Sequence, residues 1–244
     1  MEHGILMAAE SELDFMINGL FKYSFFGQEV WITTSHVCIL IVMLIILAFA
    51  VAANITMRRA SEVPTGFQNV VELIVEKLDG MAVGTMGKNA VKFRNYIGTV
   101  FIFILLSNLS GLLGLRPPTA DYGVTLPLAL ITFVLIHFNT FRYHSLKEIW
   151  IDKCSPLPPW LPIWLPINLI GDIAVPISLS LRLFANVLSG VVMMALVYGL
   201  MGKLALIWPA ALHAYLDMFS GAIQTYVFCM LTMTYINNAI GDAE

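Results

Sequence analysis

The sequence predicts an all-α polytopic membrane protein with about five membrane-embedded helices, the last two long and tilted as a hairpin, plus one amphipathic helix. Of its 244 residues, 59% are hydrophobic and only 12% are charged. A soluble domain carries about 25% charged residues, so lipid must be the solvent of this chain. Residues 36–53, 96–115 and 122–141 contain no Asp, Glu, Lys or Arg. Each run is long enough to span a hydrocarbon core of about 30 Å.

The N-terminal part divides into two predicted regions. Residues 1–30 are acidic and show no basic stretch before an apolar run, so we expect an external segment with no cleaved signal peptide. Residues 31–95 hold the first transmembrane helix and then a cytoplasmic amphipathic helix, in which Val71, Ile74 and Leu78 recur near helical spacing. A docking helix without chemistry is the favoured interpretation of this second helix.

The remainder divides into a transmembrane hairpin at residues 96–141, a cytoplasmic proline-rich connector at residues 142–165 and a second hairpin at residues 166–244. In this last region, stretches of about 36 residues on either side of Lys203 carry few charges. Such a helix is roughly 55 Å long, which exceeds the hydrocarbon thickness of about 30 Å. Both helices must therefore tilt strongly, bend or protrude.

Basic residues predict the orientation. Of the 13 Lys and Arg residues, nine lie between the first and second spans or after the third, and three lie on the opposite side. The positive-inside rule then puts the N-terminus outside and the C-terminus in the cytoplasm. We expect a multi-pass protein of a bacterial plasma membrane.

Arg182 is the most informative residue of the chain. Nine uncharged residues precede it and twenty follow it. Its guanidinium keeps its charge in a protein, and a charge near the bilayer centre costs about 2.5–3.5 kcal/mol on insertion scales. A chain that retains such a group is expected to use its fixed positive charge.

Counting outward from the turn near Lys203 aligns the two long helices. Arg182 and Gln224 each lie 21 residues from that turn, so an evenly paired hairpin brings them to one level and puts Asp217 near Ser189. A salt bridge between Arg182 and Asp217 is the alternative. Even pairing separates these two by about seven residues of helix, on the order of 10 Å, which is too far for contact.

Polar residues recur at helical spacing on both helices. They are Ser178, Arg182, Asn186 and Ser189 on the first, and His213, Asp217, Ser220 and Gln224 on the second. Serine and amide side chains often only bridge membrane helices, at about 0.6 kcal/mol each, and this is the favoured interpretation of Ser178 and Ser189. Ionisable residues at this depth usually face a pathway or a partner, which we favour for Arg182 and Asp217.

Three ordered motifs resemble subunit a of F-type ATP synthases. Residues 176–186 (PISLSLRLFAN) resemble one motif of that family, and residues 224–236 (QTYVFCMLTMTYI) resemble a second. Residues 107–114 (SNLSGLLG), followed by 117–121 (PPTAD), resemble a third. The resemblance extends over about residues 100–240.

The resemblance implies the stator half of a membrane motor, with a rotating c-subunit ring, b-type peripheral stalk subunits and the remaining ATP synthase subunits as partners. Arg182 matches the family's essential arginine, which faces carboxylates of the ring, and Asn186 and Gln224 match polar residues beside it. The positions linked to an outer ion path are matched by Asn108, Thr119, Asp121 and Asp217. The ion-binding carboxylate belongs to the ring, so the sequence leaves H⁺ and Na⁺ open.

One position departs from the family pattern. Some members carry an acidic residue or histidine where this chain has Val191. The outer path is therefore expected to rely on Asp217, His213 and water. A plain helix-bridging role is the equal alternative for His213.

Other activities find little support in the sequence. It has no Walker loop, nucleophile elbow or metal-ligand spacing, so we expect no enzyme activity in the chain by itself, no cofactor, no metal and no nucleic-acid partner. Cys38, Cys154 and Cys229 are expected to be free thiols. A secondary transporter that uses Arg182 to bind an anionic substrate is the alternative function, although such folds usually show internal repeats and none is evident here.

Overall fold

The computed structural model describes residues 19–25, 28–58, 60, 66–113, 115–154, 164–201, 211–212 and 214–241. The chain forms two compact units. Unit 1 comprises Met1–Ala50, Ile102–Asp121 and Phe184–Gln224, and unit 2 comprises Val51–Phe101, Tyr122–Leu183 and Thr225–Glu244.

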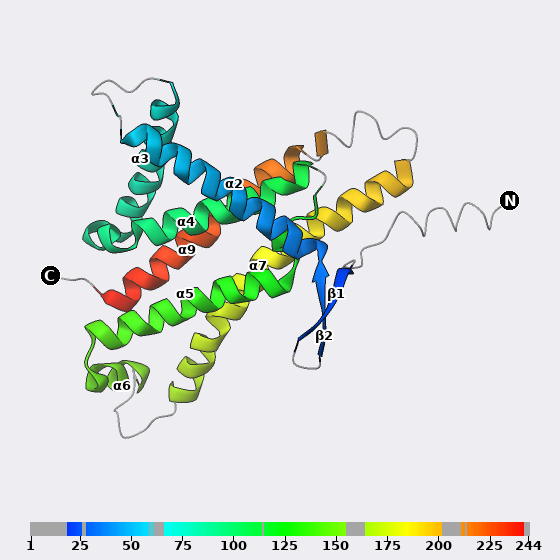
Figure 1. The fold of residues 1–244 in the computed structure, drawn as a ribbon. Helices are drawn as coiled ribbons and strands as arrows, with labels where there is room; N and C mark the ends of the chain where they lie inside the picture. The colour runs from blue at the N-terminus through cyan, green and yellow to red at the C-terminus, as the bar shows by residue number, and fades with distance from the viewer. Residues whose placement is uncertain are drawn as a thin grey trace. The chain divides into compact units, whose positions relative to one another are not determined.

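Helices make up nearly all of the described chain (Figure 1). They are α2 (Thr34–Met57), α3 (Phe67–Met86), α4 (Ala90–Leu109), α5 (Tyr122–Tyr143), α6 (Leu146–Cys154), α7 (Trp164–Met201) and α9 (Gly221–Ile240). Short 3₁₀ turns occur at Gly87–Asn89, Ser110–Leu113 and Pro118–Ala120, and a π-helix at Ala214–Ser220. The predicted all-α membrane fold is confirmed for this part of the chain.

Four helical stretches among the described residues are long and apolar enough to cross a membrane. They are Thr34–Met57, Phe67–Leu112, Tyr122–Tyr143 and Pro166–Val197. Their large apolar side chains stay exposed in the isolated chain, as Leu40 and Leu47 of α2 show with 60% exposure each. Exposed apolar surface of this extent is typical of lipid or protein contact, which supports an integral membrane protein.

A two-stranded antiparallel hairpin precedes α2 and was not predicted. β1 (Gly19–Phe25) pairs with β2 (Gln28–Thr33), with Phe25 opposite Gln28 and Lys22 opposite Trp31 (Figure 1). The two strands are rich in aromatic and β-branched residues, which favour extended backbone. Only an external segment, and no strand, was predicted for residues 1–30.

α2 begins where the hairpin ends because Thr33 and His36 cap it. The backbone N–H of Thr33 donates to Nδ1 of His36 at 3.4 Å, and the Thr33 hydroxyl lies 2.7 Å from the same nitrogen. The His36 side chain thus reaches back to the backbone N–H three residues earlier, which is one half of a capping box.

α3 is the predicted amphipathic helix, and one hydrogen bond joins it to α9 within unit 2. Its buried residues include Val71 and Met86, whereas Val70 and Val75 are exposed. The Thr85 hydroxyl donates to the sulfur of Met230 at 3.2 Å. These contacts fit a docking helix, the favoured interpretation of this segment.

α7 confirms the first of the two predicted long helices, whereas the second predicted helix is interrupted. The 38 residues of α7 amount to about 57 Å. The predicted second helix, residues 204–240, instead shows a π-helix at Ala214–Ser220 ahead of α9. Asp217 lies in the middle of this π-helix, and π-turns occur frequently at functional sites.

The connector after α5 also differs from the expectation. Part of it folds as α6, a nine-residue helix, and α7 begins at Trp164, two residues before the predicted boundary. A glutamate explains the start of α6, because the backbone N–H of Ser145 donates to Oε2 of Glu148 at 2.9 Å. The proline-rich residues 155–163 lie outside the described residues.

A polar pocket beside the long helix

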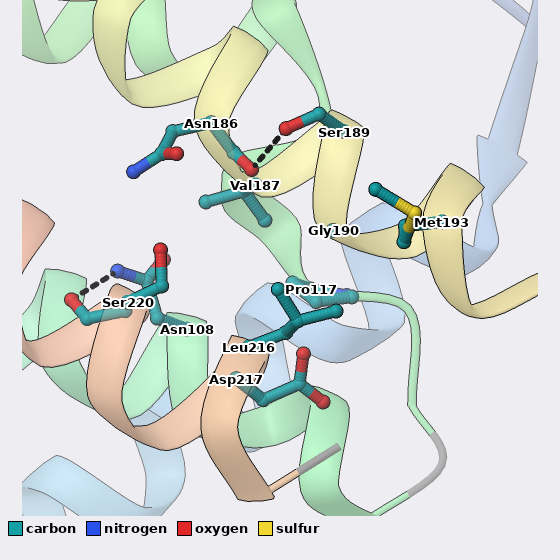
Figure 2. Close-up of a pocket in the computed structure, with 11 residues that line it drawn as sticks. Asn108, Pro117, Asn186, Val187, Ser189, Gly190, Met193, Leu216, Asp217 and Ser220 are labelled. Atoms are coloured by element: carbon teal, nitrogen blue, oxygen red, sulfur yellow. Dashed lines mark hydrogen bonds between the residues drawn. The ribbon is translucent and has the colours of Figure 1, made fainter. Parts of the chain in front are cut away.

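Unit 1 contains a pocket of about 80 Å³ in which polar side chains from three parts of the chain converge (Figure 2). α7 contributes Asn186, Val187, Ser189, Gly190 and Met193, the π-helix and the start of α9 contribute Leu216, Asp217, Ser220 and Gly221, and Asn108 and Pro117 complete it. Asp217, Ser189 and Gly190 therefore line one space, at the level that the hairpin count predicts.

Asn108 links the end of α4 to the rest of this site. Its Nδ2 donates to the carbonyl of Gly221 at 3.0 Å, and its Oδ1 accepts a 2.6 Å hydrogen bond from the Thr119 hydroxyl. Asn108 is 3% exposed and Thr119 is fully buried. Because both ends of the amide are bonded, its orientation in the pocket is fixed.

Gly111 lets the Asp217 carboxylate approach the backbone of the neighbouring turn. A β-carbon on Gly111 would lie 2.8 Å from Oδ2 and 3.1 Å from Cγ of Asp217, and 3.3 Å from Cγ of Pro117. Real β-carbons essentially never come within 3.0 Å of another heavy atom, so the contact with Oδ2 is the prohibitive one. The carboxylate can lie here only because residue 111 is a glycine, which has no β-carbon and therefore allows the close approach.

Asn186 and Gln224 are directly bonded across the hairpin. Nδ2 of Asn186 donates to Oε1 of Gln224 at 3.2 Å, and the Ser189 hydroxyl donates to the backbone carbonyl of Asn186 at 2.9 Å. Gln224 is 6% exposed, and its Nε2 has no partner among the described residues. A buried amide with an unused donor is costly, so this group can bind water or another polar partner.

Arg182 and Ser178 lie on the exposed side of α7. Both side chains are exposed, as are Asn186 and Ser189 further along the helix, whereas Leu179 and Leu183 are buried. The spacing of four residues puts Ser178, Arg182 and Asn186 on one face. Arg182 therefore presents its charge on the outside of this chain rather than in its core.

Not every predicted path residue that the structure describes lines the pocket. Asp121 is half-buried just after the 3₁₀ turn at Pro118–Ala120 and does not line the pocket. His213 lies outside the described residues. Gly111 and Gly221, which the sequence reasoning missed, permit the close contacts of Asp217 and Asn108. The sequence pattern that could have identified these two glycines is the occurrence of small residues next to polar ones in membrane helices.

The apolar helices define an integral membrane protein, and one of its candidate spans, Pro166–Val197, carries the ionisable residues Asp172 and Arg182. The family model described as ATP synthase A chain matches residues 36–237. The chain belongs to this family, which confirms the resemblance inferred from the three motifs. It is thereby one of the membrane subunits of ATP synthases, which take part in ion transport and ATP synthesis together with other subunits.

Curated relatives agree with the family match. The chain is 36% identical over 198 residues to a protein of Propionigenium modestum named "ATP synthase subunit a, sodium ion specific", covering 75% of this chain and 66% of the relative. It is 39% identical over 204 residues to "ATP synthase subunit a 1" of Syntrophotalea carbinolica, covering 82% and 84%. It is 35% identical over 201 residues to "ATP synthase subunit a" of Moorella thermoacetica, covering 82% and 87%.

Proposed function

We propose that this chain is the ion-translocating stator subunit of an F-type ATP synthase. In this proposal, two offset half-channels separated by Arg182 load and unload carboxylates on a rotating ring of c subunits. The ion-motive force thereby becomes rotation, and nucleotide chemistry takes place in other subunits.

The exposed charge of Arg182 carries the proposal. It lies on a 38-residue helix that is otherwise largely apolar, and exposure to lipid would be unfavourable for a permanent cation. A protein partner with negative charges must therefore cover this face of α7. A ring of membrane-embedded carboxylates has the required charge and the required depth.

The charge also explains how the ion is exchanged. A carboxylate that faces lipid must be neutral, because a bare charge there is too costly. A fixed positive charge nearby favours the ionised form instead. The carboxylate therefore releases its ion on one side of Arg182, passes it, and reloads from the other side. Each elementary charge that crosses gains about 2.3 kcal/mol per 100 mV.

The pocket of unit 1 is the proposed outer half-channel. Asp217 attracts cations to it, and Asn108, Asn186 and Ser189 offer hydrogen bonds to water. Its volume of about 80 Å³ accommodates a few water molecules, since each takes about 30 Å³. The remaining proposed members of the path are Thr119, Asp121, Ser178, His213 and Gln224.

Gly111→Ala is expected to lower ion-driven ATP synthesis by about threefold to tenfold in vesicles that hold the complete complex. The new methyl group must push the Asp217 carboxylate aside, and displacement of a reacting group by a fraction of an ångström reduces rates markedly. Folding should change little, because the end of one short side chain can absorb most of the clash.

Gly84→Ala is the matched control, because a β-carbon there meets no atom within 4 Å. Gly84 lies inside α3, where alanine is the better helix former by about 1 kcal/mol. Equal rates for the two variants would contradict the assigned role of Gly111.

Orientation and partners complete the proposal. The N-terminus lies outside and the C-terminus in the cytoplasm of a bacterial plasma membrane, as the distribution of Lys and Arg favours. The c-subunit ring covers the exposed face of α7, and b-type peripheral stalk subunits hold the chain in place against the torque.

Purification through a tag on this chain tests the proposal. A stator subunit brings with it a small two-helix proteolipid that forms a ring, and reconstituted vesicles pump ions when ATP is added. One relative is named sodium ion specific, so pumping is measured with and without sodium to identify the ion. Isolation as a homo-oligomer that transports an anionic solute would instead support the secondary transporter.

A further inference from the structure

Unit 2 contains a second and larger cavity, of about 820 Å³, which shares no lining residue with the pocket of unit 1. Its walls come from α5, α6, the first part of α7 and the last part of α9. The titratable groups that line it are His137, His144, Glu148, Asp172 and Tyr235. Because the connector after α5 is predicted to be cytoplasmic, this cavity lies at the inner end of the chain in the proposed orientation.

His137 has a defined tautomer in this cavity. Its Nδ1 lies 3.0 Å from the backbone carbonyl oxygen of Phe133. A carbonyl only accepts hydrogen bonds, so Nδ1 carries a proton and donates it. The ring also packs against the Phe133 ring, with centroids 4.1 Å apart. The nitrogen that remains to take up or release a proton is therefore Nε2.

Nε2 of His137 faces a carboxylate without being locked to it. It lies 3.9 Å from Oδ2 of Asp172, and the two side chains are 33% and 27% exposed. A strong hydrogen bond between such groups requires about 2.7–2.9 Å. The actual separation leaves Nε2 within reach of water in the cavity, opposite the carboxylate of Asp172.

A purely structural role accounts poorly for this arrangement. The separation between Nε2 of His137 and Oδ2 of Asp172 is too long for a hydrogen bond that would tie the two helices together, and the pair borders a large cavity. Ionisable residues within a membrane helix usually mark an ion or proton pathway. Histidine is also the side chain whose charge ordinarily changes between about pH 5 and 8.

We propose that His137 and Asp172 form a proton-exchange station on the inner access route, an inference that rests on the proposed stator function. Nε2 takes a proton from hydronium in the cavity, forming an imidazolium beside Asp172 and leaving water. The reverse step returns the proton to water. His144 and Glu148, whose Nδ1 and Oε2 lie 4.0 Å apart and are more exposed, border the same cavity and keep it hydrated.

The test uses ATP-driven pumping in vesicles that hold the complete complex, in sodium-free buffers across pH 5 to 8. His137→Gln keeps a polar group of similar reach but cannot gain the charge. It is expected to lower the rate by about tenfold, which is less than the roughly 10²–10⁴-fold that positioned proton-transfer groups contribute because water in the cavity remains, and to flatten the dependence on the inner pH. His36→Gln, at the capped start of α2, is the matched control and is expected to match the wild type.

Asp172→Asn supplies a second readout that does not require His137 to be changed. Loss of the carboxylate removes the charged group that faces Nε2 of His137, so the dependence of the pumping rate on the inner pH is expected to change. A loss of rate with an unchanged profile would reveal a structural pair and overturn the inference. Unchanged pumping in both variants would overturn it too, as would pumping that depends on sodium and ignores both changes.

The two proposals fail in different ways. If Arg182→Ala retained full coupling, the stator function itself would be wrong. If Arg182→Ala abolished coupling but neither His137→Gln nor Asp172→Asn altered the pH profile, only the inner station would be wrong.

Discussion

Arg182→Ala should reduce ATP synthesis driven by an ion gradient to background while the complex stays assembled. Without the guanidinium, nothing favours the ionised form of a passing carboxylate, so the ion is not released at the boundary between the half-channels. The same loss removes the barrier to direct leakage of cations. ATP synthesis in vesicles with an imposed gradient measures the first effect, and passive ion leakage measures the second.

Two variants on α7 serve as controls. Leu181→Met changes the exposed apolar neighbour of Arg182 without a change of charge or much change of volume, and this is expected to cost little. Arg182→Lys keeps the charge but loses the planar group that binds carboxylates with two parallel hydrogen bonds, so it should keep only part of the activity. Full coupling in Arg182→Ala would refute the assigned role of the charge.

Asp217→Asn is expected to cause the second largest loss, about tenfold or more in ion-driven ATP synthesis. The substitution keeps the shape of the side chain and therefore its fit beside Gly111. It removes the negative charge that draws cations into the pocket, although water and the neighbouring amides remain. The loss should be greatest at low external ion concentration, and a titration of the rate against that concentration measures it.

Asp79→Asn is the control for Asp217→Asn, because Asp79 also carries a carboxylate. Its Oδ1 lies 3.6 Å from Nη1 of Arg94 in an exposed pair, and such surface pairs contribute at most about 1 kcal/mol. Asp79→Asn should therefore leave the titration unchanged. A response of Asp217→Asn equal to that of Asp79→Asn would remove Asp217 from the ion path.

Two features of the sequence predicted much of the fold: long stretches without charged residues, and polar residues that recur at helical spacing. The length of α7 followed from the scarcity of charge between residues 167 and 202, and the convergence of Asp217 with Ser189 followed from counting along a hairpin. Both depend on simple geometry over long stretches, which lipid makes reliable because it excludes irregular backbone. The same reasoning missed the hairpin at Gly19–Thr33, which lies before the first span.

The finer features of the site depend on contacts between distant segments. The role of Gly111 is visible only when the π-helix lies against it, and the tautomer of His137 only when its ring is seen to bond Phe133. The direction in which Arg182 points is also a tertiary property. The sequence identified it as a charge in need of a partner, whereas the structure shows it on the outside of α7.

The seven-residue π-helix at Ala214–Ser220 sets the rotation at which α9 begins. Its hydrogen bonds close over five residues rather than the four of an α-helix, so each residue turns the chain by less than the roughly 100° of an α-helix. The same residues wound as an α-helix would present Gln224, Phe228 and Met233 at other rotations, although Gln224 bonds Asn186 and the two apolar side chains are buried. The wider turn is therefore what brings both faces of α9 to their partners.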